Sequence, residues 1–278
     1  MASDQQQRIC LVLLIGLPGV GKTTFCNDLK AFLSESNATS SLNFGLLHVC
    51  FDELLPLSKQ REMALAAQNE NSQPSLDSEP EKNFKSCRKG VHSMINEIIC
   101  SLKNKRTLSQ TDEVTKRMRL QFDLVCEKDA VLIVIDDNNY YQSMRYEYFQ
   151  LARQNEIGFC EIYLKPDSLR TVIFNNSKRP DDERIPESVI NAMNDKLEPP
   201  NPFKNPWEQF SFSISIQSIE KDKNIYNLEM CIDALKAAIE NPVKSLPEIP
   251  KDKTDEAKAA SRKICSTNVY HISDKILR

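Results

Sequence analysis

The sequence of 278 residues has few of the features that mark zinc-binding, secreted and membrane proteins. It has three histidines and nine cysteines, none in a C-x-x-C pair, so a zinc site has few ligands to draw on. An odd number of cysteines without a secretory leader indicates reduced thiols and a cytoplasmic protein. The longest apolar run, 9–17, is too short to span a bilayer and follows DQQQR rather than a basic region. We therefore expect neither a signal peptide nor a membrane partner.

An excess of one charge is also missing. The 36 basic and 39 acidic residues give a formal net charge of −3. This near-neutral balance argues against a protein that binds nucleic acid through its bulk charge, although a local basic face is still compatible with it.

Glycine is scarce, and three of the six glycines lie within GLPGVGKTT, residues 16–24. The pattern G-x-x-x-x-G-K-T, between an apolar run and a helical pattern, is that of a P-loop. Its glycines allow backbone amides to surround a phosphate, Lys22 reaches the β- and γ-phosphates, and the Thr23 hydroxyl is a ligand for Mg²⁺. The sequence thus predicts a nucleotide-binding loop made of Gly16, Leu17, Pro18, Gly19, Val20, Gly21, Lys22, Thr23 and Thr24.

Apolar runs alternate with helical patterns along the chain, which predicts an α/β fold with a parallel sheet. We expect strands at 9–15, 45–51, 130–135, 158–164 and 210–216. We expect helices at 22–34, over 91–102, in a region ending near 126, at 143–154, from 169 to at least 174, and at 226–240. A polar segment at about 57–83 is typical of a mobile insertion within a domain spanning 1–240, and 241–278 begins as a linker.

A P-loop enzyme needs a carboxylate at the end of a neighbouring strand to complete the Mg²⁺ shell. Asp136 and Asp137 follow the apolar run VLIVI and supply it. Both are candidates, with a slight preference for Asp137.

Asp52 ends the second predicted strand, where small-molecule P-loop kinases place a carboxylate near the acceptor hydroxyl. Such a group orients the hydroxyl and accepts its proton as the P–O bond forms. The alternative role is a helix N-cap, since DELL begins an apolar spacing, and one residue can serve both roles. The sequence has no N-K-x-D pattern, which argues against a GTPase, and no repeat that suggests a motor. A kinase is the favoured interpretation.

Three stretches resemble the L-seryl-tRNA(Sec) kinases, which make O-phosphoseryl-tRNA on the way to selenocysteine. They are DDNNYYQSMRYEYFQLAR (136–153), KLEPPNPFKNPWE (196–208) and ICSTNVYH (264–271). The resemblance runs over roughly 9–217, is weak across the polar insertion, and resumes near 232–278. It implies a P-loop kinase fold with a helical lid, and transfer of the γ-phosphate of ATP to the seryl hydroxyl of Ser-tRNA(Sec).

The resemblance also implies roles for individual residues. Asp52 matches the proposed base of the family, and Asp137 falls in its metal-binding strand end. Arg145 lies in a region that places substrate or nucleotide in similar kinases; its alternative is an ion pair on the helix surface with Glu147. The family's nucleotide loop is matched by Gly16, Gly19, Gly21, Lys22, Thr23 and Thr24.

The sequence departs from the family at the lid. Relatives carry R-x-x-x-R, whereas the matching stretch here is NNSKR, with Asn175 at the first position and Arg179 at the second. Catalytic arginines are worth roughly 10³–10⁵-fold in related phosphoryl transfers, so the loss of one is expected to matter. Lys178 or Arg184 is a candidate replacement; otherwise catalysis depends on Lys22 and Arg179.

The second departure is at the end of the chain, at SDKILR, where the family continues into a helical tRNA-binding domain. From this we expect a fragment, an isoform or an incomplete gene model, with a truncated tRNA-binding region at 241–278. A P-loop ATPase that accompanies the Elongator tRNA-modification complex has a similar DD-x-N-Y-Y-x-S-M-R stretch. It is the alternative function, and the oligomeric state is not predicted.

Two further features have two interpretations each. Trp207 either stacks on a base or ribose or packs in the core. A basic cluster interrupted by Asp112 and Glu113 is either a tRNA contact or a solvated helix face. The cluster consists of Lys103, Lys105, Arg106, Lys116, Arg117 and Arg119.

Overall fold

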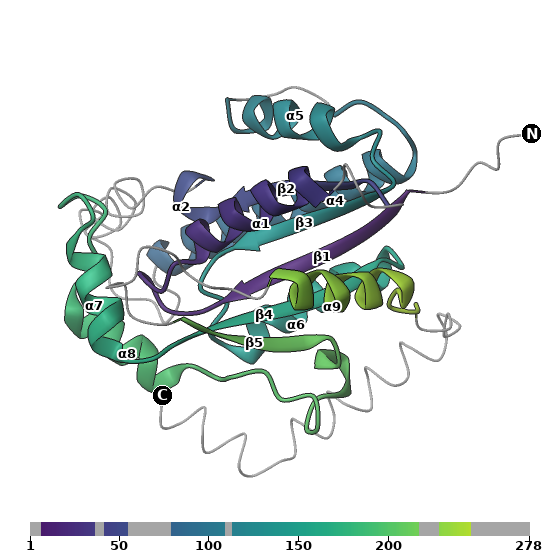
Figure 1. The fold of residues 1–278 in the computed structure, drawn as a ribbon. Coiled ribbons are helices and arrows are strands. Elements are labelled where there is room, and N and C mark those ends of the chain that lie inside the picture. The colour runs from purple at the N-terminus through teal and green to yellow at the C-terminus, as the bar shows by residue number, and fades with distance from the viewer. Residues whose placement is uncertain (1–6, 37–41, 55–78, 109–112, 217–227, 246–278) are drawn as a thin grey trace, which may run out of the picture. The chain divides into compact units, whose positions relative to one another are not determined.

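A computed structural model of the chain describes residues 7–36, 42–54, 79–108, 113–216 and 228–245. Within them lies a five-stranded sheet in the order β2-β3-β1-β4-β5, with every neighbouring pair parallel (Figure 1). The strands are β1 (Arg8–Ile15), β2 (Phe44–Cys50), β3 (Ala130–Asp136), β4 (Gly158–Pro166) and β5 (Ser211–Ile216). The predicted α/β fold class is confirmed.

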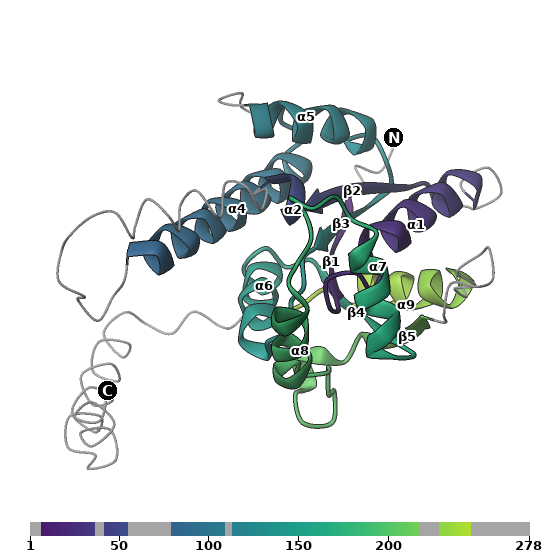
Figure 2. The same ribbon diagram turned by 90° about the vertical axis from the view of Figure 1, so that its left-hand side faces the viewer.

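Helices cover both faces of this sheet (Figure 2). One face packs against α1 (Lys22–Ser36) and α9 (Leu228–Glu240). The other packs against α4 (Glu79–Lys103), α5 (Glu113–Val125) and α6 (Gln142–Gln154). The shorter helices α2 (Phe51–Leu54), α7 (Leu169–Ser177) and α8 (Glu187–Lys196) follow strands β2 and β4 in the chain. The 3₁₀ turn η1 (Pro206–Glu208) precedes β5.

Alternate residues of the central strand enter two separate cores. Val12 and Leu14 pack toward α1 and α9, whereas Leu11 and Leu13 pack toward α4 and α6. Because both faces are buried, the strand shows an unbroken apolar run instead of an alternating pattern.

The structure differs from the sequence prediction in three places. The second strand ends at Cys50, and Phe51 and Asp52 instead open helix α2. Helix α4 begins at Glu79, inside the segment predicted as a mobile insertion, of which 57–78 lie outside the described residues. Helix α8 was not predicted, although Ile190 is buried and Met193, three residues on, packs against the same core.

The chain divides into two units, Met1–Lys244 and Ser245–Arg278, and the description concerns the first. The predicted boundary at 240–241 stays a prediction, and the predicted C-terminal extension lies outside the described residues beyond 245. None of the helices in the described part has the length and apolar character needed to cross a membrane.

Candidate active site

The predicted P-loop connects β1 to α1 at the carboxyl edge of the sheet. Its first amide, Gly16 N, donates a 3.0 Å hydrogen bond to the carbonyl of Asn138 in the loop after β3. Gly19 has a φ of +85°, and a Cβ there would lie 2.6 Å from the carbonyl oxygen of Val172 in α7. Glycine is the residue that adopts this backbone conformation easily and also leaves room for the Val172 carbonyl of α7, the helix that begins the predicted lid.

Lys22 is nearly buried and folds back over the loop. Its Nζ donates to the carbonyls of Gly16 and Leu17, both at 3.0 Å, and to Oδ1 of Asn138 at 2.9 Å. Burial lowers the pKa of Lys22, while the charges of Asp136, Asp137 and Asp52 oppose that change. The ammonium group is thus surrounded by oxygen acceptors that phosphate oxygens can replace.

Thr23 and Asp136 meet at the place predicted for Mg²⁺. The Thr23 hydroxyl donates to Asp136 Oδ2 at 2.7 Å, and His48 Nε2 lies 3.0 Å from the same oxygen. Burial alone would raise the pKa of Asp136, but the hydrogen bonds from His48 and Thr23 and the charge of Lys22 outweigh it and lower that pKa. A hydroxyl beside an ionised carboxylate is a donor set that suits Mg²⁺.

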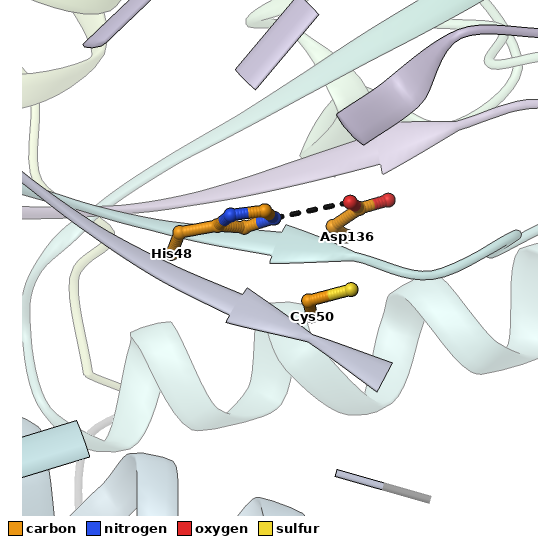
Figure 3. A group of neighbouring side chains, drawn as sticks. All are labelled: His48, Cys50 and Asp136. Atoms are coloured by element: carbon orange, nitrogen blue, oxygen red, sulfur yellow. Dashed lines mark hydrogen bonds and ion pairs between the residues drawn. The ribbon is translucent and has the colours of Figure 1, made fainter. Parts of the chain in front are cut away.

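His48, Cys50 and Asp136 form a compact cluster across β2 and β3 (Figure 3). Their candidate ligand atoms all lie within 4.8 Å of one another. Burial and the charge of Asp136 raise the pKa of the Cys50 thiol to about 12, so the sulfur is protonated at neutral pH. We therefore interpret His48 as a residue that orients Asp136.

Asp137 is turned toward a different partner. Its Oδ2 accepts a 2.7 Å hydrogen bond from Arg88 of α4, and its Oδ1 accepts one from the Asn138 amide, also at 2.7 Å. The sequence analysis gives Asp137 a slight preference as the metal carboxylate. The hydrogen bonds favour Asp136, because it is Asp136 that contacts Thr23.

Two cavities meet at this edge of the sheet. The smaller, of about 340 Å³, is lined by Pro18 to Thr24 of the P-loop. It is also lined by Asn175, Lys178 and Arg179, which belong to the predicted lid, here called the lid segment (175–184). The larger, of about 740 Å³, is lined by α2, α4, α6 and the loop after β3. Both are bounded by Thr23, Asp52, Asp137, Asn138, Arg179 and Ile185. A phosphate cradle thus opens directly onto a second, roomier chamber.

Asp52 stands at the junction of the two cavities. Its side chain is 76% exposed, and Oδ2 lies 3.8 Å from Arg179 NH1. It lies in the first turn of α2, after the first helical residue Phe51, so it is not the N-cap that was its alternative role. It borders the cradle and stays the candidate base.

The lid segment brings three of the four candidate residues to the cradle. Asn175 Nδ2 donates to the Gly19 carbonyl at 3.0 Å, and Lys178 and Arg179 line the cavity. Arg184 does not line it: its guanidinium donates to the carbonyls of Ser177 and Arg179 and pairs with Asp181. Lys178 is therefore a better candidate than Arg184 for the role that the resemblance assigns to a lid arginine.

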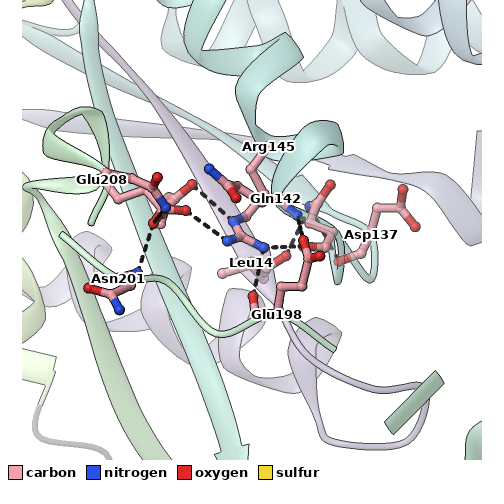
Figure 4. A network of polar contacts seen from close by, with 10 residues as sticks. Leu14, Asp137, Gln142, Arg145, Glu198, Asn201 and Glu208 are labelled. Atoms are coloured by element: carbon pink, nitrogen blue, oxygen red, sulfur yellow. Dashed lines mark hydrogen bonds and ion pairs between the residues drawn. The ribbon is translucent and has the colours of Figure 1, made fainter. Parts of the chain in front are cut away.

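Arg145 is the clearest correction to the predicted site. Its side chain is fully buried and lines neither cavity, so it is neither a cradle residue nor a partner of Glu147 on the surface. It donates to Glu208 Oε1 at 2.7 Å and to the Glu198 carbonyl at 2.9 Å, and lies 3.3 Å from Glu161 Oε1 (Figure 4). A guanidinium can satisfy several fixed acceptors at once, which suits it to joining segments.

These contacts connect two of the stretches that carried the resemblance. The Glu198 carboxylate accepts from the Gln142 amide at the start of α6, and its amide donates to the Tyr140 carbonyl. Glu208 in turn accepts from the Asn201 amide at 2.7 Å (Figure 4). The proline-rich segment is thus a support for the loop that carries Asp136 to Tyr141.

Trp207 favours the packing interpretation, whereas both interpretations of the basic cluster stay predictions. Trp207 packs among Tyr146, Phe149 and Phe159 and lines neither cavity of the site. Lys105 and Arg106 are exposed and border a separate cavity of about 660 Å³, which shares no residue with the two above. The side chains of Lys116 and Arg117 lie outside the described part.

Sequence reasoning missed His48, Arg88 and Asn138. His48 had a weak signal, since a polar residue two positions before the end of a buried strand shares a face with the strand's last residue. Asn138 directly follows the two aspartates. Arg88 had no signal in the sequence, because it reaches Asp137 only through the way α4 packs in the fold.

Comparison with known proteins agrees with this geometry. The family model described as "Chromatin associated protein KTI12" matches residues 9–276. The human L-seryl-tRNA(Sec) kinase is 31% identical over 300 residues, covering 99% of this chain and 78% of the human protein. The mouse L-seryl-tRNA(Sec) kinase is 31% identical over 308 residues, covering 99% of this chain and 75% of that protein.

Among solved structures, Chaetomium thermophilum Kti12 in complex with ADP-AlF3 has a TM-score of 0.52 at 18% identity. The match covers 82% of this chain and 98% of that one, and it shows a shared fold. The chain therefore belongs to the KTI12 family of P-loop proteins and, within it, to the group of the L-seryl-tRNA(Sec) kinases.

Proposed function

We propose that this protein transfers the γ-phosphate of ATP to the seryl hydroxyl of Ser-tRNA(Sec), giving O-phosphoseryl-tRNA(Sec) in the cytoplasm. The observation that best supports this proposal is the junction of the two cavities, where Asp52 and Arg179 lie 3.8 Å apart and Thr23 lines both cavities. A donor cradle and an acceptor chamber that share a carboxylate and a guanidinium are the parts that phosphoryl transfer requires.

In the proposed reaction the seryl Oγ attacks the γ-phosphorus of ATP. The Oγ–P bond forms as the bond to the β,γ-bridging oxygen breaks, ADP leaves, and Asp52 accepts the hydroxyl proton. Lys22 exchanges its carbonyl partners for the β- and γ-phosphate oxygens, and Arg179 stabilises the charge on the transferring group.

Thr23 and Asp136 are the residues that would hold Mg²⁺, Thr23 directly and Asp136 in the shell, with Asp137 beside them. When bound, the ion neutralises charge on the phosphates. His48 contacts the same Asp136 oxygen that accepts from Thr23, so its role is to orient that carboxylate.

The proposal is tested with γ-labelled ATP and seryl-tRNA(Sec), followed by release and identification of the amino acid. We expect labelled phosphoserine from the wild-type protein and none from Lys22→Ala. Asp52→Asn should keep its affinity for a fluorescent ATP analogue while transfer slows. Full transfer by Asp52→Asn would show that another group accepts the proton.

The alternative is an ATPase of the Kti12 type, supported by the family model and the shared fold. The full-length identity of 31% to the two mammalian kinases favours the kinase. ATP hydrolysis stimulated by tRNA, without phosphoserine, would overturn the kinase and favour the ATPase.

A further inference from the structure

One group of side chains at the edge of the cradle combines ligand types that Mg²⁺ does not use together. His48 and Cys50 lie on β2 and Asp136 lies on β3, and their candidate ligand atoms are all within 4.8 Å of one another (Figure 3). An imidazole nitrogen, a cysteine sulfur and a carboxylate oxygen are the donors that Zn²⁺ takes in proteins. Mg²⁺ prefers oxygen alone. The group therefore suits a different class of cation from the one proposed for the cradle.

The backbone register places these three side chains on one face of the sheet. His48 and Cys50 are two residues apart on a strand, so their side chains point to the same side. Cys50 is the partner of Asp136 in the parallel ladder between β2 and β3. The sequence analysis expected few ligands for zinc because no C-x-x-C pair occurs. The fold instead assembles an H-x-C pattern from one strand and an aspartate from another.

His48 is held in place from the outer side of its strand. Gln121 of α5 accepts from the His48 amide at 2.8 Å and donates to the His48 carbonyl at 3.2 Å. Its side chain thus bonds the two backbone groups that strand β2, at the edge of the sheet, would otherwise leave open. His48 Nε2 lies 3.0 Å from Asp136 Oδ2. Two ligand atoms of a tetrahedral Zn²⁺ ion are about 3.3–3.8 Å apart, so this pair is already close to the required spacing.

The sulfur of Cys50 needs only a small movement to complete the set. A closure of roughly 1 Å brings the 4.8 Å limit of the group to the spacing of zinc ligands. Rotation about the single χ1 bond of cysteine moves its sulfur by that distance or more. Cys50 lines the larger cavity and Asp136 lines the smaller one, so both cavities give an ion access to the group. A water from either cavity supplies the fourth ligand.

We propose that His48, Cys50 and Asp136 bind a thiophilic divalent cation of the Zn²⁺ class, and that this ion inhibits the site by withdrawing Asp136 from the Mg²⁺ shell. As the S–Zn bond forms, the thiol proton leaves to water; the imidazole binds through Nε2 and carries its proton on Nδ1. Nitrogen and sulfur ligands favour Zn²⁺ over Mg²⁺, so Zn²⁺ competes at far lower concentration. Binding of the ion does not depend on the phosphoryl acceptor, whereas inhibition of the kinase rests on the proposed function.

A titration with Cd²⁺ tests the site in the full chain, kept reduced with a non-thiol reductant. The readout is the ultraviolet charge-transfer band of a Cd–S bond. We expect Cys50→Ser to lose one equivalent of this band relative to the wild type. Cys100→Ser removes an exposed thiol outside the group and is the matched control, which should keep it. His48→Ala should weaken Cd²⁺ binding at least about tenfold, because it removes a direct ligand.

Nucleotide binding tests the inhibition without any phosphoryl acceptor. Mg²⁺ is titrated against the protein and a fluorescent ATP analogue, with and without Zn²⁺. We expect Zn²⁺ to raise the Mg²⁺ concentration for half-maximal binding at least about tenfold in the wild type and less than about twofold in Cys50→Ser. Zn²⁺ bound to the nucleotide affects both proteins equally, so the difference reports the site on the protein. Without Zn²⁺ the two should bind the analogue equally, since Cys50 does not line the cradle, and this also shows that Cys50→Ser is folded.

Three outcomes separate the two proposals. Failure to form phosphoserine on Ser-tRNA(Sec) overturns the proposed function and leaves the Cd²⁺ band unaffected. An equal Cd²⁺ band in the wild type and Cys50→Ser overturns the metal site. A band that depends on Cys50, together with an unchanged Mg²⁺ requirement in Zn²⁺, overturns the inhibition.

Discussion

Asp136 is the residue on which the proposed metal site depends. Its Oδ2 accepts from Thr23 and contacts His48, whereas Asp137 is bonded to Arg88 and to the chain itself. The two neighbours in sequence therefore have different environments, because adjacent residues at the end of a strand point in different directions.

This difference gives the first prediction. Asp136→Asn should lower kcat and the Mg²⁺-dependent affinity for ATP by roughly 10–100-fold, since it removes the charge beside Thr23. Asp137→Asn should have a smaller effect on both. Titrating nucleotide binding with and without Mg²⁺ separates metal binding from chemistry. A greater loss of Mg²⁺ dependence in Asp137→Asn would reverse the assignment.

Glu161 gives a second prediction at the same scale. It is buried in the middle of β4 and shares the guanidinium of Arg145 with Glu208. Burial raises the pKa of Glu161 to about 8, although Arg145 opposes the shift. The folded protein thus holds a proton on Glu161 more tightly than the unfolded chain does.

The direction in which pH changes the free energy of unfolding follows from the raised pKa of Glu161 in the folded protein. The stability from protonated Glu161 is fully present below the unfolded pKa of 4.5 and is lost as pH rises toward about 8. Glu161→Gln does not titrate, so its free energy of unfolding relative to wild type should rise between pH 5 and pH 9, by on the order of a few kcal/mol. Urea unfolding of both proteins across this range measures it. A difference independent of pH would show that Glu161 is ionised throughout.

At the scale of elements, the lid helix α7 docks directly on the P-loop. Gly19 provides the close approach to Val172, and Asn175 provides the hydrogen bond to the Gly19 carbonyl. The position where the resemblance predicts an arginine is thus occupied by an amide that binds the loop backbone. Lys178 and Arg179 are the lid cations that reach the cradle among the described residues.

The third prediction concerns this helix. Asn175→Arg places a guanidinium at the cradle and should raise kcat for phosphoryl transfer by at least about tenfold, because it supplies charge for the transferring phosphate. Asn175→Ala is the control that removes only the hydrogen bond to Gly19. Rapid-quench measurement of transfer would decide between them. If both variants lose rate equally, the contact with the P-loop matters more than the missing charge.

The strand and helix pattern was largely predictable because the sheet is buried on both faces. The runs at β1, β3 and β4 are nearly continuous and are followed by Gly16, Asp136 and Lys165, which places their boundaries within one or two residues. Helix α8 escaped prediction although Ile190 and Met193 both pack against the core, because the segment is short and most of its residues are polar. The start of α4 escaped it because the sequence there is polar.

At the scale of the molecule, Arg145 joins segments that are distant along the chain. It contacts the loop after β3 through Asn139, strand β4 through Glu161 and the proline-rich segment through Glu198 and Glu208. Because the guanidinium, Glu161 and Glu208 are buried, removing Arg145 leaves the Glu208 carboxylate and several backbone carbonyls without their partner.

The fourth prediction follows from this position. Arg145→Met should lower the free energy of unfolding by about 3–5 kcal/mol. Arg119→Met, at a half-exposed pair with Asp123, should cost less than about 1 kcal/mol. Denaturant unfolding measures both, and the affinity for ATP should stay near that of the wild type wherever Arg145→Met remains folded. A large loss of ATP affinity in the folded variant would show that Arg145 acts in the catalytic site after all.

The sequence by itself determined the P-loop, the strand end that carries Asp136 and Asp137, and the kind of fold. These features are local: glycine spacing, apolar runs and the polar residues that end them depend on neighbours along the chain. Only the tertiary structure decided which aspartate contacts Thr23 and that Arg145 is buried. It also decided that an aromatic and acidic cavity adjoins the cradle. Those facts depend on side chains brought together from separate segments, which no local pattern records.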